Sequence, residues 1–324
     1  MTKIIRIGTR ESQLAVWQAT LVQQLLAKNN QPAELVFIKS EGDIDLQTPL
    51  YEIGVQGIFT RSLDIALINN KIDIAVHSMK DVPTQLPKGI VQSAVLPRAS
   101  YKDIFVYKGE LSSIEDELGY DAGKWATHDS RFITHHSPFT IATSSIRRMA
   151  QWLNRYPNHS IENLRGNVNT RLRKVQENNW QGAIFAAAGL ERINLRPEKS
   201  IELDWMLPAP AQGAIMIVCR DGDEVCLQAC DLLNDAATAT CAKIERDFLR
   251  TLLGGCSTPI SALAEIKDDQ IYFRGNILSA DGKEKVSIDK WITHAEANEA
   301  GSVLANKILL NGGEKIALAI RNAK

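Results

Sequence analysis

The sequence predicts an α/β protein with two α/β units followed by a smaller C-terminal α+β unit. Strands and helices alternate from residue 3 to residue 77 and again from residue 139, as in parallel sheets whose two faces are covered by helices. A polar stretch at about 110–137 separates the two series. After residue 260, several strands precede a helix, which is typical of an α+β unit.

In the first unit we expect strands at 3–7, 33–39 and 72–77, and helices after the turn at 8–12 and over 59–68. Along the first helix, four apolar side chains recur at helical spacing and so share one face: Leu14, Trp17, Leu21 and Leu25. Residues 40–58 are rich in glycine and polar side chains, as lids and binding loops often are. The alternative is a disordered surface insertion.

Strands expected at 91–96 and 104–107 lead into the second unit. Its polar stretch carries His128, His135 and His136, whose spacing matches no metal-ligand cluster, so we predict a solvated insertion and no metal. Further elements expected are a strand at 139–142, a helix capped by Ser144 and ending near 156, and strands near 161 and at 182–188.

A stiff segment at 208–213 should cross back, so that the strand at 214–219 rejoins the first unit. The elements expected after it are helices at 224–233 and 236–252, a tight turn at 254–259, strands at 262–266, 271–278 and 286–292, and a helix at 295–310. We therefore predict three domains: 1–98 with 212–232, then 99–211, then 236–324.

Composition and charge exclude some classes of function. The chain of 324 residues has 23% charged residues and a formal net charge of -1, which argues against a surface devoted to nucleic acid. Its five cysteines have no paired spacing, which indicates a reducing compartment. We see no signal-peptide pattern and no membrane-spanning run, so we predict a cytoplasmic protein without nucleic-acid or membrane partners.

Polar residues gather at the end of the strand at 72–77. His77, Ser78, Lys80 and Asp81 follow its apolar residues directly. In open α/β sheets, ligands bind at the carboxyl ends of the strands, so these side chains are candidates for a binding site. The alternative is an ordinary turn with a solvated Lys80 and Asp81.

Arginine recurs where strands give way to helices. The residues concerned are Arg10, the pair Arg147 and Arg148 after Thr143 and Ser145, then Arg165, Arg171 and Arg192. Strand ends of one sheet share an edge, so we expect the last five arginines to converge. Guanidinium forks bind carboxylates and phosphates bidentately, and we find no nucleotide-binding glycine motif, so the pattern favours a ligand with several carboxylates.

Two further residues suggest chemistry rather than binding alone. Asp81 in a cationic cleft could stabilise positive charge on a substrate or shuttle a proton. Cys256 follows two glycines, which would let a bulky covalent adduct lie close to the backbone. The alternatives are a small buried thiol and a non-catalytic binding protein for a polycarboxylate.

Seven motifs in this order resemble one family from end to end, the porphobilinogen deaminases (hydroxymethylbilane synthases). They are Arg6-Ile7-Gly8-Thr9-Arg10, His77 to Pro83, Thr143 to Arg148, Leu164 to Arg171, Ala186 to Leu190, Gln212-Gly213-Ala214 and Gly254-Gly255-Cys256. The resemblance implies three domains, of which the first two are like periplasmic binding proteins with the active cleft between them. It also implies an enzyme, usually monomeric, that joins four porphobilinogen molecules head to tail into hydroxymethylbilane and releases ammonia.

The resemblance also implies a dipyrromethane cofactor joined by a thioether to Cys256, with Asp81 as the main catalytic group and Arg10 beside it. Residues implied to hold the cofactor are Ser78, Lys80, Asp81, Thr143, Ser145, Arg147, Arg148 and Arg171. Residues implied to serve the substrate or the growing chain are Arg10, Gln18, Arg165 and Arg192. Two departures from the family pattern are Gln56, where a lysine is common, and the length of the stretch at 110–137.

Overall fold

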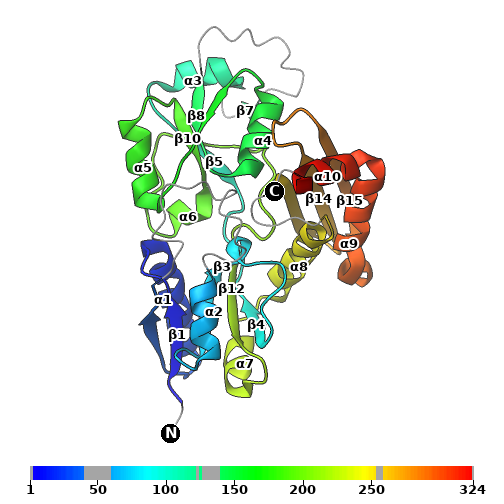
Figure 1. Ribbon diagram of the computed structural model, residues 1–324. Coiled ribbons are helices and arrows are strands. Elements are labelled where there is room, and N and C mark those ends of the chain that lie inside the picture. The colour runs from blue at the N-terminus through cyan, green and yellow to red at the C-terminus, as the bar shows by residue number, and fades with distance from the viewer. Residues whose placement is uncertain (1–2, 40–59, 122–123, 126–138, 253–257, 323–324) are drawn as a thin grey trace.

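The computed structural model describes residues 3–39, 60–121, 124–125, 139–252 and 258–322 (Figure 1). Two α/β units lie one above the other, and a third unit lies beside their junction (Figure 1). This is the predicted fold class: two α/β units and a small C-terminal α+β unit. In the ranges that the structure describes, no helix combines the length and apolar character needed to cross a bilayer.

The first unit is a sheet in the order β2-β1-β3-β12-β4. Its strands are β1 (Ile5–Thr9), β2 (Ala33–Phe37), β3 (Ile74–Ser78), β4 (Ile90–Val95) and β12 (Ile215–Arg220). Helices α1 (Gln13–Lys28), α2 (Arg61–Ile68) and α7 (Glu224–Asp231) belong to this unit. Strand β12 runs antiparallel between β3 and β4, so the chain does return to the first sheet where the sequence predicts it.

Helix α1 buries a different face from the one that its leucines suggest. Its buried residues are Gln18, Ala19, Val22 and Leu26. Leu21 and Leu25 reach only the margin of the core, and Trp17 is 36% exposed. The face with the small side chain of Ala19 packs against the sheet. Trp17 lies on a side of the helix that is turned away from the sheet.

The second unit repeats the first sheet's pattern in the order β9-β8-β10-β5-β11, with β5 as its antiparallel strand. Its strands are β5 (Asp103–Tyr107), β8 (Thr140–Ala142), β9 (Ser160–Glu162), β10 (Gly182–Ala186) and β11 (Ser200–Glu202). Its helices are α3 (Leu111–Leu118), α4 (Ile146–Arg155), α5 (Val168–Glu177) and α6 (Ala187–Glu191). The strand predicted to reach residue 188 ends at Ala186, because α6 begins there.

The prediction of a solvated insertion at 110–137 is wrong for its first part. Residues 111–118 form α3, whose Ile114 and Leu118 are buried in the core of the second unit. A short ribbon of β6 (Tyr120–Asp121) and β7 (Lys124–Trp125) follows. Apolar side chains one helical turn apart stabilise this helix despite its polar composition. His128, His135 and His136 lie outside the described residues.

The third unit is the sheet β13-β14-β15 covered on one face by helices. Its strands are β13 (Ile260–Lys267), β14 (Gln270–Leu278) and β15 (Lys285–Thr293), and its helices are α8 (Ala236–Thr251), α9 (Ala297–Ile308) and α10 (Glu314–Asn322). The sequence analysis did not predict α10. Helix α8 packs on β13 and also contacts β4 of the first unit, so it reaches the junction of all three units (Figure 1).

Candidate functional site

The turn after β3 carries the first cluster of candidate residues. Ser78 ends the strand, and Met79–Asp81 form a single 3-10 turn. Met79 is buried in the core and its N–H donates to Ala214 O at 3.0 Å. With Met79 anchored inward, Lys80 and Asp81 are left half-buried at the edge of the sheet. Gln18 Nε2 donates to Ser78 Oγ at 2.9 Å and links α1 to this strand end.

His77 stands apart from these polar residues. It is buried, and its Nε2 has no hydrogen-bond partner among the described residues. Burial, and secondarily the positive charge of Arg10, lower the pKa of His77 to about 4. The imidazole is therefore neutral near pH 7, and the structure gives it no role beyond packing at the strand end.

Asp103 binds several side chains at the junction of the two α/β units, and the sequence did not predict this role. Its carboxylate is fully buried and accepts hydrogen bonds from Arg147 Nη2 at 2.8 Å, Arg148 Nη2 at 2.8 Å and Gln212 Nε2 at 3.0 Å. Burial alone would raise the pKa of Asp103, but the charges of Arg147 and Arg148 outweigh it and lower the pKa to about 2. An acid at the start of the apolar strand 103–107 was the available signal.

Lys80 joins this cluster through the crossing segment. Its Nζ donates to Gln212 Oε1 at 3.3 Å, and Gln212 in turn donates to Asp103. Burial lowers the pKa of Lys80 to about 8, and the positive charges of Arg148 and Arg147 act in the same direction. Asp81 and Asp103 oppose the shift, which places all of these charges close together. The ammonium is thus held at a position where an added negative charge would stabilise it.

The start of α4 provides hydroxyl and amide groups beside the arginines. The N-cap is Ser145, whose Oγ accepts from Arg148 N at 3.4 Å; the predicted cap, Ser144, instead bonds Leu164 O and Asn163. Thr143 Oγ1 accepts from Ser145 N at 3.2 Å and is buried. Such a helix start favours negative charge near it.

Arg165 and Arg171 extend the cationic cluster from α5. Asn167 caps α5 by accepting from Thr170 N at 3.0 Å, and Arg171 Nε donates to Gly166 O at 2.7 Å. Burial lowers the pKa of Arg171 to about 10, and the nearby charges of Arg148 and Arg165 add to the effect. The predicted convergence therefore holds for four arginines: Arg147, Arg148, Arg165 and Arg171.

Arg192 lies elsewhere, where the two α/β units meet. Its Nη2 donates to Gly213 O at 2.7 Å, and its guanidinium lies 5.8 Å from the ring centroid of Trp17. Burial lowers the pKa of Arg192 to about 10. A second contact joins the same helix to the second unit: Asn169 Nδ2, on α5, donates to Oε1 of Gln13, at the start of α1, at 3.0 Å. The outward face of α1 thus contacts the second unit, which explains why Trp17 is not part of the core (Figure 1).

The chain crosses between the two α/β units twice, at 96–102 between β4 and β5 and at 208–213 before β12, and the two crossings pack closely at Gly213. Gly213 has φ +88°, and a Cβ there would lie 2.6 Å from Ala99 O. Gln212 Nε2 also donates to Tyr101 O at 2.8 Å, so it bridges both crossings as well as Lys80 and Asp103. The motif Gln212-Gly213 is therefore explained by the geometry of the junction.

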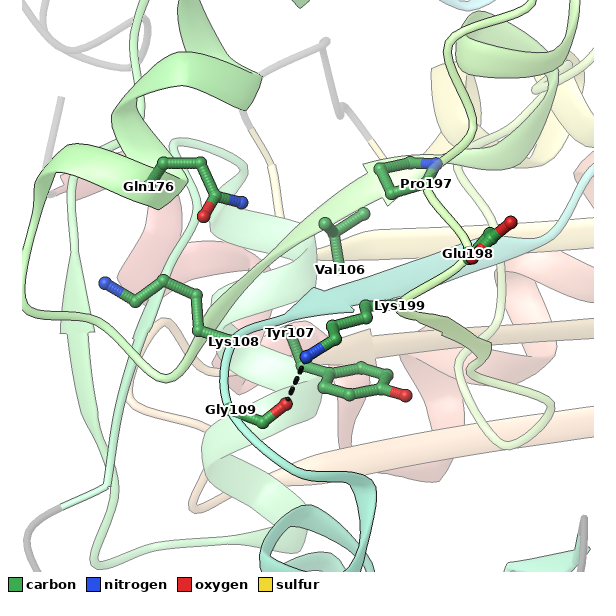
Figure 2. A pocket seen from close by; sticks show the side chains of 8 residues that line it. All are labelled: Val106, Tyr107, Lys108, Gly109, Gln176, Pro197, Glu198 and Lys199. Atoms are coloured by element: carbon green, nitrogen blue, oxygen red, sulfur yellow. Dashed lines mark hydrogen bonds between the residues drawn. The ribbon is translucent and has the colours of Figure 1, made fainter.

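A pocket of about 380 Å³ lies at the opposite end of β5 (Figure 2). Lys199 Nζ donates to Gly109 O at 2.9 Å, and Lys108 Nζ donates to Asn178 O at 2.6 Å. Both ammonium groups are thus already hydrogen-bonded to backbone carbonyls of the protein. Tyr107 ends β5 here, whereas Asp103 begins it at the junction, so this pocket is separate from the candidate site.

Several predicted features fall outside the described residues: the loop at 40–58 with Gln56, and the Gly254-Gly255-Cys256 motif. Helix α8 ends at Thr251, shortly before Cys256. The cysteines that the structure does describe are free and buried: Cys219, Cys226, Cys230 and Cys241. Within the same ranges, no three His, Cys, Asp or Glu side chains are grouped so as to hold a metal ion.

Comparison with known sequences decides the family. The dipyrromethane cofactor-binding domain of porphobilinogen deaminase matches residues 5–228, and the C-terminal domain of the same enzyme matches residues 239–310. The chain belongs to the porphobilinogen deaminase family. It is an enzyme of tetrapyrrole synthesis, with the activity also named hydroxymethylbilane synthase.

Relatives in three organisms show how much of the chain the likeness covers. A porphobilinogen deaminase of Syntrophotalea carbinolica is 38% identical over 98% of this chain and 96% of its own length. The enzyme of Campylobacter hominis is 37% identical, with 95% of each chain covered. The chloroplastic enzyme of Oryza sativa is 41% identical over 86% of this chain and 75% of its own. The porphobilinogen deaminase likeness is thus continuous across all three units.

Solved structures of binding proteins match the fold more remotely. A periplasmic binding protein of Salmonella typhimurium is 11% identical and covers 74% of this chain and 94% of its own, with a TM-score of 0.37. The ligand-binding component of an import system of Staphylococcus aureus is 16% identical and covers 76% and 74%, also with a TM-score of 0.37. This likeness is too remote to indicate a ligand or an activity.

Proposed function

We propose that this chain joins four porphobilinogen molecules into hydroxymethylbilane at the junction built around Asp103, on a dipyrromethane held there. One observation carries the proposal: Arg147 and Arg148 bind the buried Asp103, and Lys80 is linked to the same acid through Gln212. In this gathering of cations, burial and neighbouring positive charges lower the pKa values of Lys80 and Arg171 to about 8 and about 10. A side chain whose pKa is lowered in this way keeps its positive charge more readily when an anionic ligand binds beside it. The carboxylates of pyrrole acids supply the negative charge.

The residues at the junction fit the cofactor's carboxylates. We propose that Arg147, Arg148, Arg171 and Lys80 hold the cofactor through their positive charge, and that Ser78, Thr143 and Ser145 add hydroxyl groups. The forks of Arg147 and Arg148 already bind Asp103, so their contribution is mainly the positive field around that acid. Arg171 donates from Nε to Gly166 O, and a guanidinium fork is suited to binding a carboxylate bidentately. We propose that Cys256 anchors the cofactor through a thioether. When bound, the group would supply the free α-position to which the first pyrrole is joined, and so would anchor the growing chain.

We propose that Asp81 is the catalytic carboxylate. It is half-buried beside Lys80 and is close enough to Arg171 to oppose the lowering of that arginine's pKa. Loss of ammonia leaves positive charge on the substrate pyrrole, and a carboxylate preorganised in a partly dry site stabilises such charge strongly. We propose that Arg10 assists Asp81 in catalysis. Its positive charge acts on His77, which lies near the end of β3, the strand that leads to Asp81.

The incoming substrate is proposed to contact Arg10, Gln18, Arg165 and Arg192. Gln18 already touches Ser78, and Arg165 adds to the field that acts on Arg171, so both lie beside the proposed cofactor site. Arg192 lies where α1 meets the second unit, next to Trp17. This arrangement would place a carboxylate of the substrate between the two units.

We propose the domain boundaries given by the sequence, 1–98 with 212–232, 99–211 and 236–324, because both chain crossings lie at these limits. We also propose that the enzyme acts as a monomer, as the family resemblance implies. The four described cysteines are free thiols, which supports a reducing compartment such as the cytoplasm.

Mass spectrometry of the intact, denatured protein tests the proposed function. The protein purified in active form should exceed its sequence mass by two pyrrole units. Cys256→Ser should lose that excess, whereas the matched control Cys241→Ser, at another thiol near α8, should keep it. An unmodified mass in active enzyme, or an adduct that survives in Cys256→Ser, would contradict the assignment.

A further inference from the structure

The turn that carries Lys80 and Asp81 is held from behind by a side chain of the third unit. Arg246, on α8, is only 9% exposed. Its Nη1 donates to Met79 O at 3.2 Å and to Val82 O at 2.9 Å, and its Nη2 donates to Pro83 O at 2.6 Å. The three carbonyls flank the Lys80–Asp81 pair on both sides.

The chemistry of this contact explains why an arginine is suited to it. A single 3-10 turn leaves most of its carbonyls without partners in the turn; here the one bond is Val82 N to Met79 O at 3.2 Å. A guanidinium offers its donors in a rigid plane, so three carbonyls bound to it are held at one orientation. A lysine ammonium could also donate to these carbonyls, but its donors do not lie in one rigid plane, so it would not fix their orientation.

The position of Arg246 in the chain adds a second relation. Helix α8 ends at Thr251, and Cys256 follows five residues later. The same helix also places Glu245, whose carboxylate accepts from Arg98 Nη1 at 2.8 Å and from Ala211 N at 2.6 Å. Arg98 and Ala211 belong to the two crossing segments. Helix α8 is thus tied to the junction through Glu245 as well as through Arg246.

We propose that Arg246 is a positioning residue for Asp81. It holds the Met79–Pro83 backbone against α8 and thereby sets where the Asp81 carboxylate lies relative to the Asp103 junction. This inference rests on the proposed catalytic role of Asp81. Arg246 itself does not need to touch the substrate.

Steady-state kinetics with porphobilinogen test the inference on the full-length protein loaded with its cofactor. Arg246→Ala should lower kcat by about tenfold to a hundredfold, as expected for a displacement of about 1 Å at a reacting group, with KM within about twofold. Arg250→Ala is the matched control, because Arg250 lies one turn further along α8, is exposed and pairs only locally with Asp247 at 2.8 Å among the described residues. The control should leave both constants unchanged.

A double-mutant cycle separates positioning from general support of the fold. In the Asp81→Asn background, Arg246→Ala should cost no more than about twofold, because the group that it positions is already lost. An equal fold-loss of kcat in both backgrounds would overturn the inference while leaving Asp81 catalytic. Wild-type turnover of Asp81→Asn would instead overturn the role of Asp81, and the inference with it. If Arg246→Ala does not fold, Arg246→Lys serves in the same cycle with the same readings.

Discussion

Two buried aspartates gather cations in this molecule, and the two clusters are balanced differently. Asp73 directly precedes β3 and meets Arg6 Nε at 2.9 Å, Arg220 Nη2 at 3.0 Å and Lys3 Nζ at 3.0 Å. Its cations are partly exposed, and Arg220 also pairs with Asp223 at 2.7 Å. The hydrogen bond to Asp73 raises the pKa of Arg6, so its charge is stabilised by the protein itself.

Asp103 begins β5 and is shared by Arg147 and Arg148, with Lys80 and Arg171 nearby. Here burial lowers the pKa values of Arg147, Arg171 and Lys80. The two clusters thus differ in the direction of the shift: the pKa of Arg6 beside Asp73 is raised, whereas the pKa values of the cations around Asp103 are lowered. The cations of the Asp73 cluster have their acid within the protein, and we propose that the cations of the Asp103 cluster are completed by negative charge brought by a ligand.

The largest expected effect concerns stability at Asp73. Asp73→Asn leaves Arg6 and Arg220 without their shared carboxylate, which costs about 3 kcal/mol, the lower end for a buried ion pair, because both guanidinium groups are partly exposed. Urea unfolding should show this loss, while turnover per folded molecule stays near wild type. Asp221→Asn, an exposed acid close by, is the control and should change neither. A loss of turnover in folded Asp73→Asn would break the division between the clusters.

Asp81→Asn should show the opposite pattern. Removing the carboxylate should lower kcat by about 10²–10³-fold, the range found when one preorganised electrostatic group is removed from a site. Stability to urea should change little, because Asp81 is only half-buried. Single-turnover measurements on the cofactor-loaded protein check this, and turnover like that of wild type would refute the catalytic role.

Acid titration gives a smaller effect at Asp103. The pKa of its carboxyl is about 2 in the folded chain and near 3.9 when unfolded, so its contribution is complete above about pH 4 and is lost as the pH falls through 2. The loss amounts to about 2 kcal/mol. Unfolding free energies measured from pH 5 to pH 2 should fall less steeply in Asp103→Asn. An unchanged slope would show that Asp103 is not held by its arginines.

The smallest effect is expected at the exposed edge of the Asp73 cluster. Lys3 is 44% exposed, so Lys3→Met should cost no more than about 1 kcal/mol, and added salt should reduce that cost. Denaturant unfolding at two ionic strengths measures it. A larger cost that is insensitive to salt would mean that Lys3 shares equally with Arg6 and Arg220 in holding Asp73.

The sequence predicts local elements well and long-range partners poorly. The alternation of apolar strands and helices predicts both sheets, and polar residues at strand ends point to Lys80, Asp81 and Arg147. By contrast, Asp103 and Arg246 depend on partners 44 and 167 residues away in the chain. Only the folded chain brings such partners together. Helix α3 was not predicted because its sequence is mostly polar, with only two buried apolar side chains. Ser145 rather than Ser144 caps α4, because the Ser144 hydroxyl is hydrogen-bonded to Leu164 O.

The most direct test of this account compares two arginines in the Cys256→Ser protein, once its mass shows that no pyrrole is attached. Arg171→Met removes a cation from the Asp103 cluster, and Arg6→Met removes one from the Asp73 cluster. Urea unfolding should give Arg171→Met a higher free energy of unfolding than its parent, because a half-buried cation at a cation-rich position is replaced by an apolar side chain. Arg6→Met should be less stable than the parent. If Arg171→Met destabilises the cofactor-free protein as much as Arg6→Met does, the junction is balanced by the protein alone and the account is wrong.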